Sequence, residues 1–287
     1  MPDPKIEIKG LGRSFKSKES KDDFWALSGF DLTVEKGEFL AVVGPSGCGK
    51  STLLDLVVGL SKASAGEILI DGKPISGPAL DRGIVLQGYA LFPWRTVKQN
   101  IEFGLEIKKV PKKERGKVAE RFIKLVELEG FEDHYPHELS GGMQQRVAIA
   151  RALAYDPEVL LMDEPFAAVD AQTREVMQDE LLAIWEKTGK TILFVTHSIE
   201  EAVALSDRVA VMSKSPGTVK EVVNVALPRP RRIKDVRNTP AFRLATGQVW
   251  DLLQNKAHES EADDSAEAKS AKPSFDIGNE ILPDAVI

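Results

Sequence analysis

A stretch of nine residues, 44–52 (GPSGCGKST), limits what this chain can fold into more than any other segment. It follows the apolar run 39–43 and precedes the run 53–58, so the pattern predicts a buried strand, a glycine-rich turn and a helix. Glycines let backbone N–H groups wrap closely around phosphate oxygens, and the helix directs its positive dipole end at the same oxygens. The segment therefore predicts a P-loop, which binds the phosphates of a nucleoside triphosphate.

Three side chains of this loop have expected roles. Lys50 is expected to reach the β- and γ-phosphates, and Ser51 to place its hydroxyl on Mg²⁺. Cys48 lies at the start of the helix, which favours its thiolate, so we expect thiol modification to block nucleotide binding. A glycine-rich turn that only closes a strand–helix unit is the alternative. The nucleotide-binding residues predicted here are Gly44, Pro45, Ser46, Gly47, Cys48, Gly49, Lys50, Ser51 and Thr52.

Composition places the chain among ordinary soluble proteins. Its 287 residues suit one large α/β domain with an appendage, or two small domains, and 43% hydrophobic residues supply a full core. A formal net charge of −6 argues against a nucleic-acid partner. Residues 1–5 show no secretory signal, and no apolar run approaches the ~18–20 residues that cross a bilayer. The single cysteine excludes an internal disulfide and fits a reducing cytoplasm.

Apolar periodicity predicts an α/β fold with a parallel core sheet and an added antiparallel β-layer. Near-continuous apolar runs are typical of parallel strands with both faces covered by helices. The core strands are expected at 39–43, 159–162, 191–195 and 208–212, with helices at 173–187 and 198–205 between them. Short strands at 6–9, 30–34, 67–70 and 83–86 are expected to form the added layer.

An inserted helical subdomain is expected at about 88–156. Val118, Phe122 and Leu125 recur at near-helical spacing within the first helix, 112–128, and a second helix is expected over 142–154. The main domain, which includes this block, is expected to span residues 1–227, followed by a helical appendage at 228–254. The polar, low-complexity segment 255–287 is expected to be a disordered tail, with a docking role for its apolar end as the alternative.

A P-loop enzyme needs an acidic element to hold its metal ion and to activate water. Asp163 and Glu164 end the buried run 159–162. Asp163 is expected to hold Mg²⁺, directly or through water, and Glu164 to polarise the attacking water. An Asp-Glu-Pro turn that only ends a strand is the alternative.

Residues 139–146 (LSGGMQQR) decide between classes of P-loop protein. Ser140, Gly141 and Gly142 open a predicted helix and form a second anion site. Two phosphate cradles are too many for one nucleotide, so the second is expected to serve the nucleotide of a second copy. Here the chain resembles the ATP-binding-cassette (ABC) ATPases, whose signature is LSGGQ. Met143 stands where the family usually has Gln, which removes one possible polar contact to the nucleotide.

The resemblance spans about residues 5–227 and implies further site residues. Gln87 matches the Q-loop glutamine, which ligates Mg²⁺ and senses the transmembrane partner. Asp170 matches the D-loop residue at the dimer interface. His197 matches the switch histidine, which contacts the γ-phosphate.

The adenine contact and one histidine pair leave alternatives open. Phe15 is expected to stack on adenine, with Phe24 and Trp25 as rivals, since any of the three could instead belong to the core. His134 and His137 have no cysteine or carboxylate set to complete a metal site, so they are expected to be loop residues.

The mechanism that the resemblance implies is ATP hydrolysis with Mg²⁺, catalysed by Lys50, Glu164 and His197. Two cassettes, either two copies or this chain and a homologous cassette, close head to tail on ATP, and hydrolysis reopens them and moves transmembrane subunits. The implied partners are integral-membrane permease subunits and, indirectly, a periplasmic or lipid-anchored solute-binding protein. The implied location is peripheral, on the cytoplasmic face of the inner membrane.

Two classes of cassette compete, a transporter subunit and a soluble ABC ATPase acting on nucleic acid or ribosomes. Repair-type cassettes carry a long coiled-coil insert, whereas fewer than a hundred residues separate the P-loop from the signature here. Ribosome-acting cassettes usually carry two P-loops in one chain, and this chain has one. The net acidity also argues against a nucleic-acid clamp, so a transporter subunit is expected.

Several segments resemble the nitrate/sulfonate/taurine importer ATPases. They are 77–85 (GPALDRGIV), 91–97 (LFPWRTV), 227–231 (LPRPR) and 249–253 (VWDLL). The resemblance implies uptake of a small solute such as nitrate, a sulfonate or taurine, or a related small anion. The aromatic residues of 88–97 are expected to contact permease helices, with a place in the subdomain core as the alternative.

Overall fold

The computed structural model of the chain describes residues 4–16, 23–167 and 169–254. The described residues up to Leu253 form one compact unit. The predicted tail, 255–287, lies outside the described residues. None of the described helices combines the length and the apolar run that a membrane span requires.

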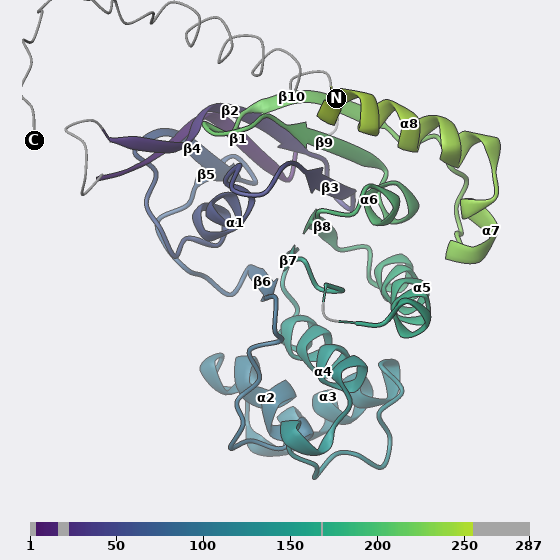
Figure 1. Cartoon of the computed structure of the whole chain (residues 1–287). Helices are drawn as coiled ribbons and strands as arrows, with labels where there is room; N and C mark the ends of the chain where they lie inside the picture. Colours follow the sequence, from purple (N-terminus) through teal and green to yellow (C-terminus); the bar gives the residue numbers. More distant parts are fainter. Residues whose placement is uncertain (1–3, 17–22, 168, 255–287) are drawn as a thin grey trace, which may run out of the picture. The chain divides into compact units, whose positions relative to one another are not determined.

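A six-stranded core sheet carries the P-loop (Figure 1). Its strand order is β10-β9-β3-β8-β7-β6, with β10 antiparallel to β9 and the other neighbours parallel. The strands are β3 (Phe39–Val43), β6 (Arg82–Val85), β7 (Val159–Asp163), β8 (Thr191–Val195), β9 (Arg208–Met212) and β10 (Val219–Asn224). The four core strands expected from the sequence are all present and adjacent.

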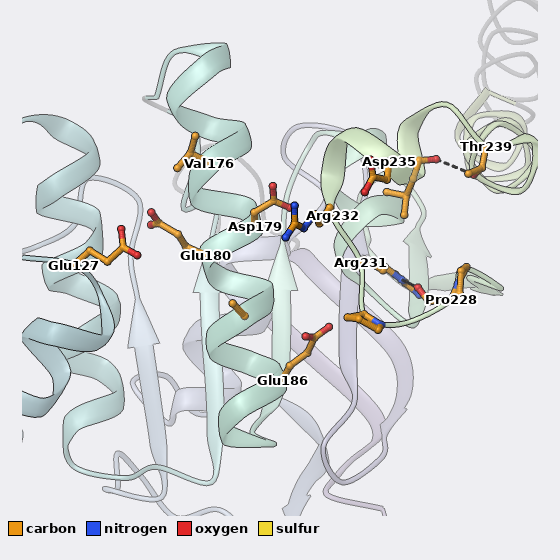
Figure 2. Close-up of a pocket in the computed structure, with 13 residues that line it drawn as sticks. Glu127, Val176, Asp179, Glu180, Glu186, Pro228, Arg231, Arg232, Asp235 and Thr239 are labelled. Carbon is orange, nitrogen blue, oxygen red and sulfur yellow. Dashed lines mark hydrogen bonds between the residues drawn. The ribbon is translucent and has the colours of Figure 1, made fainter.

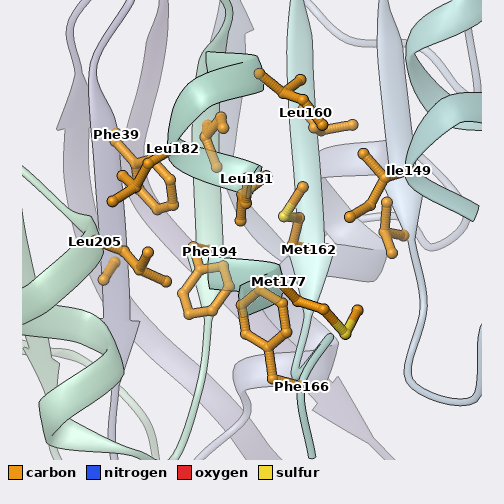
Figure 3. Packing of buried hydrophobic residues seen from close by; sticks show 14 of the residues in the cluster. Phe39, Ile149, Leu160, Met162, Phe166, Met177, Leu181, Leu182, Phe194 and Leu205 are labelled. Carbon is orange, nitrogen blue, oxygen red and sulfur yellow. The ribbon is translucent and has the colours of Figure 1, made fainter. Parts of the chain in front are cut away.

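Both faces of this sheet are buried, and alternate residues of each strand serve different faces. In β3, Phe39, Ala41 and Val43 belong to a cluster with α4 (Gly141–Ala154), α5 (Ala171–Thr188) and α6 (Ile199–Leu205). Leu40 and Val42 belong to a second cluster with α1 (Lys50–Val58) and the antiparallel sheet. Figure 3 shows the first cluster, in which side chains of α5 and α6 lie over Phe39, Leu160, Met162 and Phe194.

A four-stranded antiparallel sheet packs beside α1, in the order β2-β1-β4-β5. Its strands are β1 (Ile6–Phe15), β2 (Phe24–Val34), β4 (Ala65–Ile70) and β5 (Lys73–Pro74). Ile6, Ile8 and Leu32 alternate with exposed residues and fill the second cluster. The sheet therefore supplies the apolar cover that helices supply on the opposite face.

One strand was assigned to the wrong sheet by the sequence. The run 83–86 was expected in the antiparallel layer, but β6 (Arg82–Val85) pairs in parallel register with β7, Gly83 opposite Leu160 and Val85 opposite Met162. A four-residue apolar run does not indicate which strand it will pair with, because the pairing depends on the tertiary fold. Strand β10 and helix α2 (Val97–Ile107) were not individually predicted.

The helical block is built from α2, α3 (Lys112–Leu125) and α4. Helix α2 starts with a reciprocal capping box between Thr96 and Gln99. Gly104 of this helix lets it approach Tyr155 closely, because an added Cβ would lie 2.1 Å from the Tyr155 ring. Helix α3 ends three residues earlier than predicted, and Glu127 just beyond it has a left-handed φ of 55°.

The C-terminal helices α7 (Ile233–Arg237) and α8 (Pro240–Gln254) pack against the first cluster. Arg231 anchors them, because its guanidinium donates to four carbonyl oxygens, those of Ala204 (3.3 Å), Ser206 (2.7 Å), Leu227 (2.9 Å) and Pro228 (3.3 Å). Burial lowers the pKa of Arg231 to about 10, so it stays charged at neutral pH. The boundary at 227/228 between cassette and appendage stays a prediction.

Arg231→Met removes these donors and leaves four carbonyl oxygens without them. We expect the free energy of unfolding to fall by about 3 kcal/mol, since each orphaned buried acceptor costs about 1–3 kcal/mol and some regain water. Urea denaturation of the full chain measures this change. The neighbouring exposed residue supplies the control, and Arg232→Met should stay within about 0.5 kcal/mol. Equal stability of the two variants would contradict the anchoring role.

Candidate functional site

The P-loop turns from β3 into α1 through conformations that only glycine adopts freely. Gly49 has φ 96°, and a Cβ there would lie 2.8 Å from the carbonyl oxygen of Ala26. Gly44 is equally tight, since its Cβ would lie 2.7 Å from Cys48 Sγ. No side chain caps the start of α1. Its first N–H groups are therefore available to an anion at the positive end of the helix.

Lys50 supplies the positive charge of this loop. Its ammonium donates to the carbonyl oxygens of Gly44 (2.8 Å) and Pro45 (3.0 Å), and the side chain is buried. The flexible stem folds back under the loop, so the charge lies inside the loop that is predicted to hold the phosphates.

The carboxyl ends of β7 and β8 bring two acidic residues and a histidine together. Glu164 follows β7 with a left-handed φ of 43°, and its N–H donates to the carbonyl oxygen of Val195 (2.9 Å). Its carboxylate lies 3.0 Å from His197 Nδ1, and the imidazole is 64% exposed. The pair predicted from distant sequence positions thus forms a direct contact at the open edge of the sheet.

Asp163 connects this edge to the P-loop. Burial raises the pKa of its carboxyl, while a hydrogen bond from Ser51 and the charge of Lys50 oppose that rise, and Glu164 and Asp55 reinforce it. A nearby cation would favour the charged form of this carboxyl.

The predicted Mg²⁺ ligands suit a cation that also binds phosphate and water. Within the described residues, no group of three or more His, Cys, Asp or Glu side chains could hold a metal ion. The predicted set of Ser51, Gln87 and Asp163 contains a single carboxylate. Mg²⁺ is commonly bound by one or two carboxylates, with substrate phosphates and water as the remaining ligands. These residues fit the ion, and Mg²⁺ stays a proposal.

Gln87 follows β6 and is exposed beside the end of β7. The next three residues, Gly88 (φ 80°), Tyr89 (64°) and Ala90 (47°), all have left-handed backbones. Arg151 of α4 donates to the carbonyl oxygens of Tyr89 (2.9 Å) and Ala90 (2.7 Å). Sequence reasoning missed this contact, because 61 residues separate Arg151 from Ala90 and no local pattern connects them.

The second predicted cradle lies at the start of α4. Ser140 is the N-cap of this helix and accepts from the N–H of Met143 (3.3 Å). Gly141 approaches the hydroxyl of Tyr89, and Gly142 approaches Thr173 of α5. No hydrogen bond among the described residues joins Ser140 to the P-loop, so the two cradles do not meet through such a bond within one copy.

Asp170 has a local role that the sequence analysis did not name. It is the N-cap of α5 and accepts from the N–H groups of Gln172 (3.1 Å) and Thr173 (3.0 Å). These backbone hydrogen bonds, chiefly that from Thr173, lower the pKa of its carboxyl. The side chain is exposed, and its place at a dimer interface stays a prediction.

The three candidate adenine contacts all reach solvent. Phe15 is 43% exposed, Phe24 53% and Trp25 40%, so none of them belongs to the core, contrary to the alternative. Phe15 and Phe24 face each other across the β1–β2 pair, and Trp25 packs on Gly12. Stacking of Phe15 on adenine stays a prediction.

His134 and His137 lie beside aromatic rings in the loop before α4. The ring of His134 is 5.0 Å from that of Phe131, and His137 stacks on Tyr135 at 5.9 Å. The 3₁₀ helix Pro136–Glu138 includes His137. Both contacts are ordinary packing of a loop that leads to Ser140.

The expected reactivity of Cys48 was wrong. Its side chain is completely buried, and burial raises the pKa of the thiol more than Lys50 and the local N–H groups lower it. Position at a helix start favours a thiolate only where the sulfur is accessible, and here Cys48 belongs to the second apolar cluster.

Cys48 should therefore react slowly. We expect maleimide labelling of the folded chain at pH 7.5 to be at least about 10-fold slower than labelling of the chain unfolded in guanidinium. The control is Ser76→Cys in a Cys48→Ser background, because position 76 is exposed and should label at the unfolded rate. Fast labelling of native Cys48 would restore the thiolate hypothesis.

A cleft of about 850 Å³ lies between α5 and residues 228–239 (Figure 2). Its lining includes Glu127, Asp179, Glu180 and Glu186, with Arg231 and Arg232 opposite. None of the predicted nucleotide residues lines it. The acidic character also suits a phosphate ligand poorly, so this cleft is not the nucleotide site.

Asp163→Asn should stabilise the nucleotide-free chain at pH 7.5. Because the folded-state pKa of Asp163 is raised, the folded chain binds this proton more tightly than the unfolded chain, and the charged form costs stability above that pKa. The gain in melting temperature should therefore shrink as the pH falls through the folded pKa towards the ordinary carboxyl range.

Asp156→Asn is the matched control. A hydrogen bond from Lys190 lowers the pKa of Asp156, so removing its charge should slightly destabilise the chain. The pair is exposed, which limits the loss to about 0.5 kcal/mol. A lower melting temperature for Asp163→Asn than for the unmodified chain would show that the burial of Asp163 is offset by its partners.

Comparisons with known proteins show the family to which the chain belongs. The sequence profile of the family described as "ABC transporter" matches residues 27–167. An uncharacterised ABC transporter ATP-binding protein of Methanocaldococcus jannaschii is 56% identical over 227 residues, 79% of this chain and 84% of that protein. The nitrate import ATP-binding protein of Synechocystis is 45% identical over 259 residues, 88% and 97% of the two chains. An aliphatic sulfonates import ATP-binding protein of Bacillus cereus is 51% identical over 228 residues, 79% and 88%.

Solved structures give the same result. A dimeric bacterial ABC transporter cassette superposes with a TM-score of 0.69 at 35% identity, covering 78% of this chain and all of that one. The dimeric post-hydrolysis state of such a cassette, bound to ADP and Pi, gives a TM-score of 0.68 at 34% identity, with the same coverage.

Proposed function

Because the chain belongs to the ATP-binding-cassette transporter family and is an ATP-binding ATPase, we propose that it energises uptake of a small solute through separate transmembrane subunits. The predicted fold class is confirmed, namely a cassette with a parallel core sheet, an antiparallel layer and a helical block. The resemblance to import ATPases is confirmed as well. The residue roles and the solute belong to the proposal.

The observation that carries the chemistry is the 3.0 Å contact between Glu164 and His197 at the strand edge beside the P-loop. In this position Glu164 accepts a proton from the attacking water, while His197 holds the carboxylate by its Nδ1. Lys50 and the N–H groups of the loop bind the phosphates. Ser51, Gln87 and Asp163 would hold Mg²⁺, which would supply positive charge to neutralise the charge on the phosphate oxygens.

The complete site is proposed to need two copies or a homologous partner cassette. Within one chain, Ser140 lies at the start of α4 and its described hydrogen bonds are local. Related cassettes of known structure are dimeric. Ser140, Gly141 and Gly142 of one copy would then face the nucleotide of the other, with Asp170 at the interface.

Permease subunits are proposed to contact the loop before α2. Phe92 packs on Phe103, with ring centroids 4.5 Å apart, whereas Trp94 is 71% exposed. Phe92 thus packs within the subdomain, as one alternative expects, whereas Trp94 is available for contact with a permease, as the other expects. A cassette held in this way lies at the cytoplasmic face of the inner membrane.

The proposed solute is a small anion, nitrate or a sulfonate or a close analogue. The support is the names of two relatives, a nitrate and an aliphatic sulfonates import ATP-binding protein. A periplasmic or lipid-anchored binding protein would select the solute. No observation favours the soluble alternative acting on nucleic acid or ribosomes.

Glu164→Gln should lower ATP turnover by about 100-fold or more, because loss of a general base costs about 10²–10⁴-fold. It should also trap an ATP-bound closed pair. Size-exclusion chromatography with ATP, together with a phosphate-release assay, measures both effects. Glu200→Gln is the control, since Glu200 is an exposed carboxylate at the start of α6. Full turnover by Glu164→Gln would contradict its role.

Affinity capture tests the transporter assignment. The tagged Glu164→Gln chain is recovered with ATP from detergent-solubilised native membranes. Co-purification of a polytopic membrane protein supports the importer. The solute-binding protein that associates with this membrane protein can then be assayed with nitrate and with an alkanesulfonate. Recovery of ribosomes, nucleic acid or soluble proteins alone would overturn the assignment.

A further inference from the structure

The two residues that flank His197 both form hydrogen bonds with Glu201, Thr196 with its carboxylate and Ser198 with its backbone N–H. Thr196, which precedes the histidine, donates its hydroxyl to Glu201 Oε2 at 2.7 Å. Ser198, which follows it, accepts from the N–H of Glu201 at 3.3 Å and donates its own N–H to Thr196 Oγ1 at 3.0 Å. The residues on both sides of His197 are therefore fixed by hydrogen bonds, while its imidazole is exposed.

The same ring of hydrogen bonds is tied to the P-loop strand. The N–H of Thr196 donates to the carbonyl oxygen of Val42 at 3.2 Å, two residues before Gly44. Thr196 and Glu201 are 1% and 6% exposed. A displacement of Glu201 would thus be felt directly by the loop that carries His197.

Glu201 is an expensive residue to bury. Burial raises the pKa of its carboxyl, and the Thr196 hydroxyl, Arg174, His197 and Arg237 only partly compensate. A buried carboxylate with incomplete compensation does not maximise stability, because an uncharged amide of the same shape would fit the same hydrogen bond.

Arg174, on the first turn of α5, connects Glu201 to the loop that precedes this helix. Its Nη2 donates to the carbonyl oxygen of Val169 at 2.7 Å, next to Asp170. Its Nε lies 3.7 Å from Glu201 Oε1. One guanidinium therefore contacts both the Asp170 loop and the carboxylate that holds the His197 loop.

We propose that Arg174 and Glu201 are positioning residues for ATP hydrolysis, which fix the His197 loop relative to the Asp170 loop. The contacts that carry this inference are Arg174 to Val169, Arg174 to Glu201, and Glu201 to Thr196. It rests on the proposed pairing of His197 with Glu164. Neither Arg174 nor Glu201 touches the nucleotide residues of the P-loop, so their effect on hydrolysis is indirect.

An ordinary stabilising ion pair is the competing explanation. One such pair lies next to it on α5, where Arg237 Nη1 is 3.6 Å from Glu175 Oε2. Its length and residue types match those of the Arg174–Glu201 pair, but it joins α5 to α7 rather than to the His197 loop. Glu175→Gln is therefore the matched control.

The experiment measures steady-state ATP hydrolysis by the full chain with Mg²⁺, together with thermal unfolding. The variants are Glu201→Gln, Arg174→Ala, the double variant, Glu175→Gln and His197→Ala. We expect Glu201→Gln and Arg174→Ala to lower kcat about 10- to 100-fold, because small misplacements of a catalytic group cost this much. The KM for ATP should change less than about 2-fold, since binding groups are untouched.

Stability separates positioning from a structural role. Glu201→Gln keeps an oxygen that can accept from Thr196 and removes a charge whose burial raises the pKa of Glu201, so its melting temperature should be equal or higher while kcat falls. A merely structural pair would instead lower the melting temperature. Should Arg174→Ala fail to fold, Glu201→Gln carries the test alone, as it needs no cavity.

Coupling gives the second criterion. In the double variant kcat should match the more damaged single variant, because both substitutions interrupt the same connection. Multiplied losses would overturn the connection, as would a normal kcat in Glu201→Gln. Loss of turnover in His197→Ala with normal Arg174→Ala and Glu201→Gln would overturn this inference alone. Full turnover by His197→Ala would overturn both it and the proposed site chemistry.

Discussion

Burial of the parallel sheet on both faces decides where this protein can place its chemistry. The two apolar clusters occupy the faces, so polar groups can gather only at the strand ends. The order β3-β8-β7-β6 then sets the sequence of groups along one edge. The P-loop follows β3, His197 follows β8, Asp163 ends β7 and Gln87 follows β6. Residues more than 100 positions apart become neighbours because their strands are neighbours.

Charges at this edge are held at some cost to stability. Burial raises the pKa of Asp163 and of Glu201, so the folded chain would be more stable if either carboxylate were protonated or replaced by an amide. Arg231, far from the edge, also has a charge that burial disfavours, since its pKa is lowered to about 10 although four carbonyl oxygens accept from its guanidinium. Burial also raises the pKa of Glu38 and of Glu180, so this cost is not confined to the reacting groups.

The sequence predicts those features that local motifs determine. It does not predict features that depend on contacts between segments far apart in the chain. The Gly44–Lys50 loop, the Ser140 cap and the position of Glu164 at a strand end follow from short motifs whose glycines and caps have local causes. The sheet to which β6 belongs does not, because Val85 and its neighbours would fit either layer. The thiol of Cys48 was misjudged for the same reason, since its burial depends on residues outside the loop.

The loop after Gln87 shows how a contact from a distant segment stabilises a strained backbone. Tyr89 and Ala90 have left-handed backbones without being glycine, which costs about 1 kcal/mol each. Arg151 of the helical block donates to the carbonyl oxygens of both residues, and hydrogen bonds from a charged donor of this kind contribute about 1.5–3 kcal/mol. The strained conformation therefore persists only while α4 holds it. Since Ser140 caps the same helix, the geometry of Gln87 and that of the second cradle depend on one rigid element.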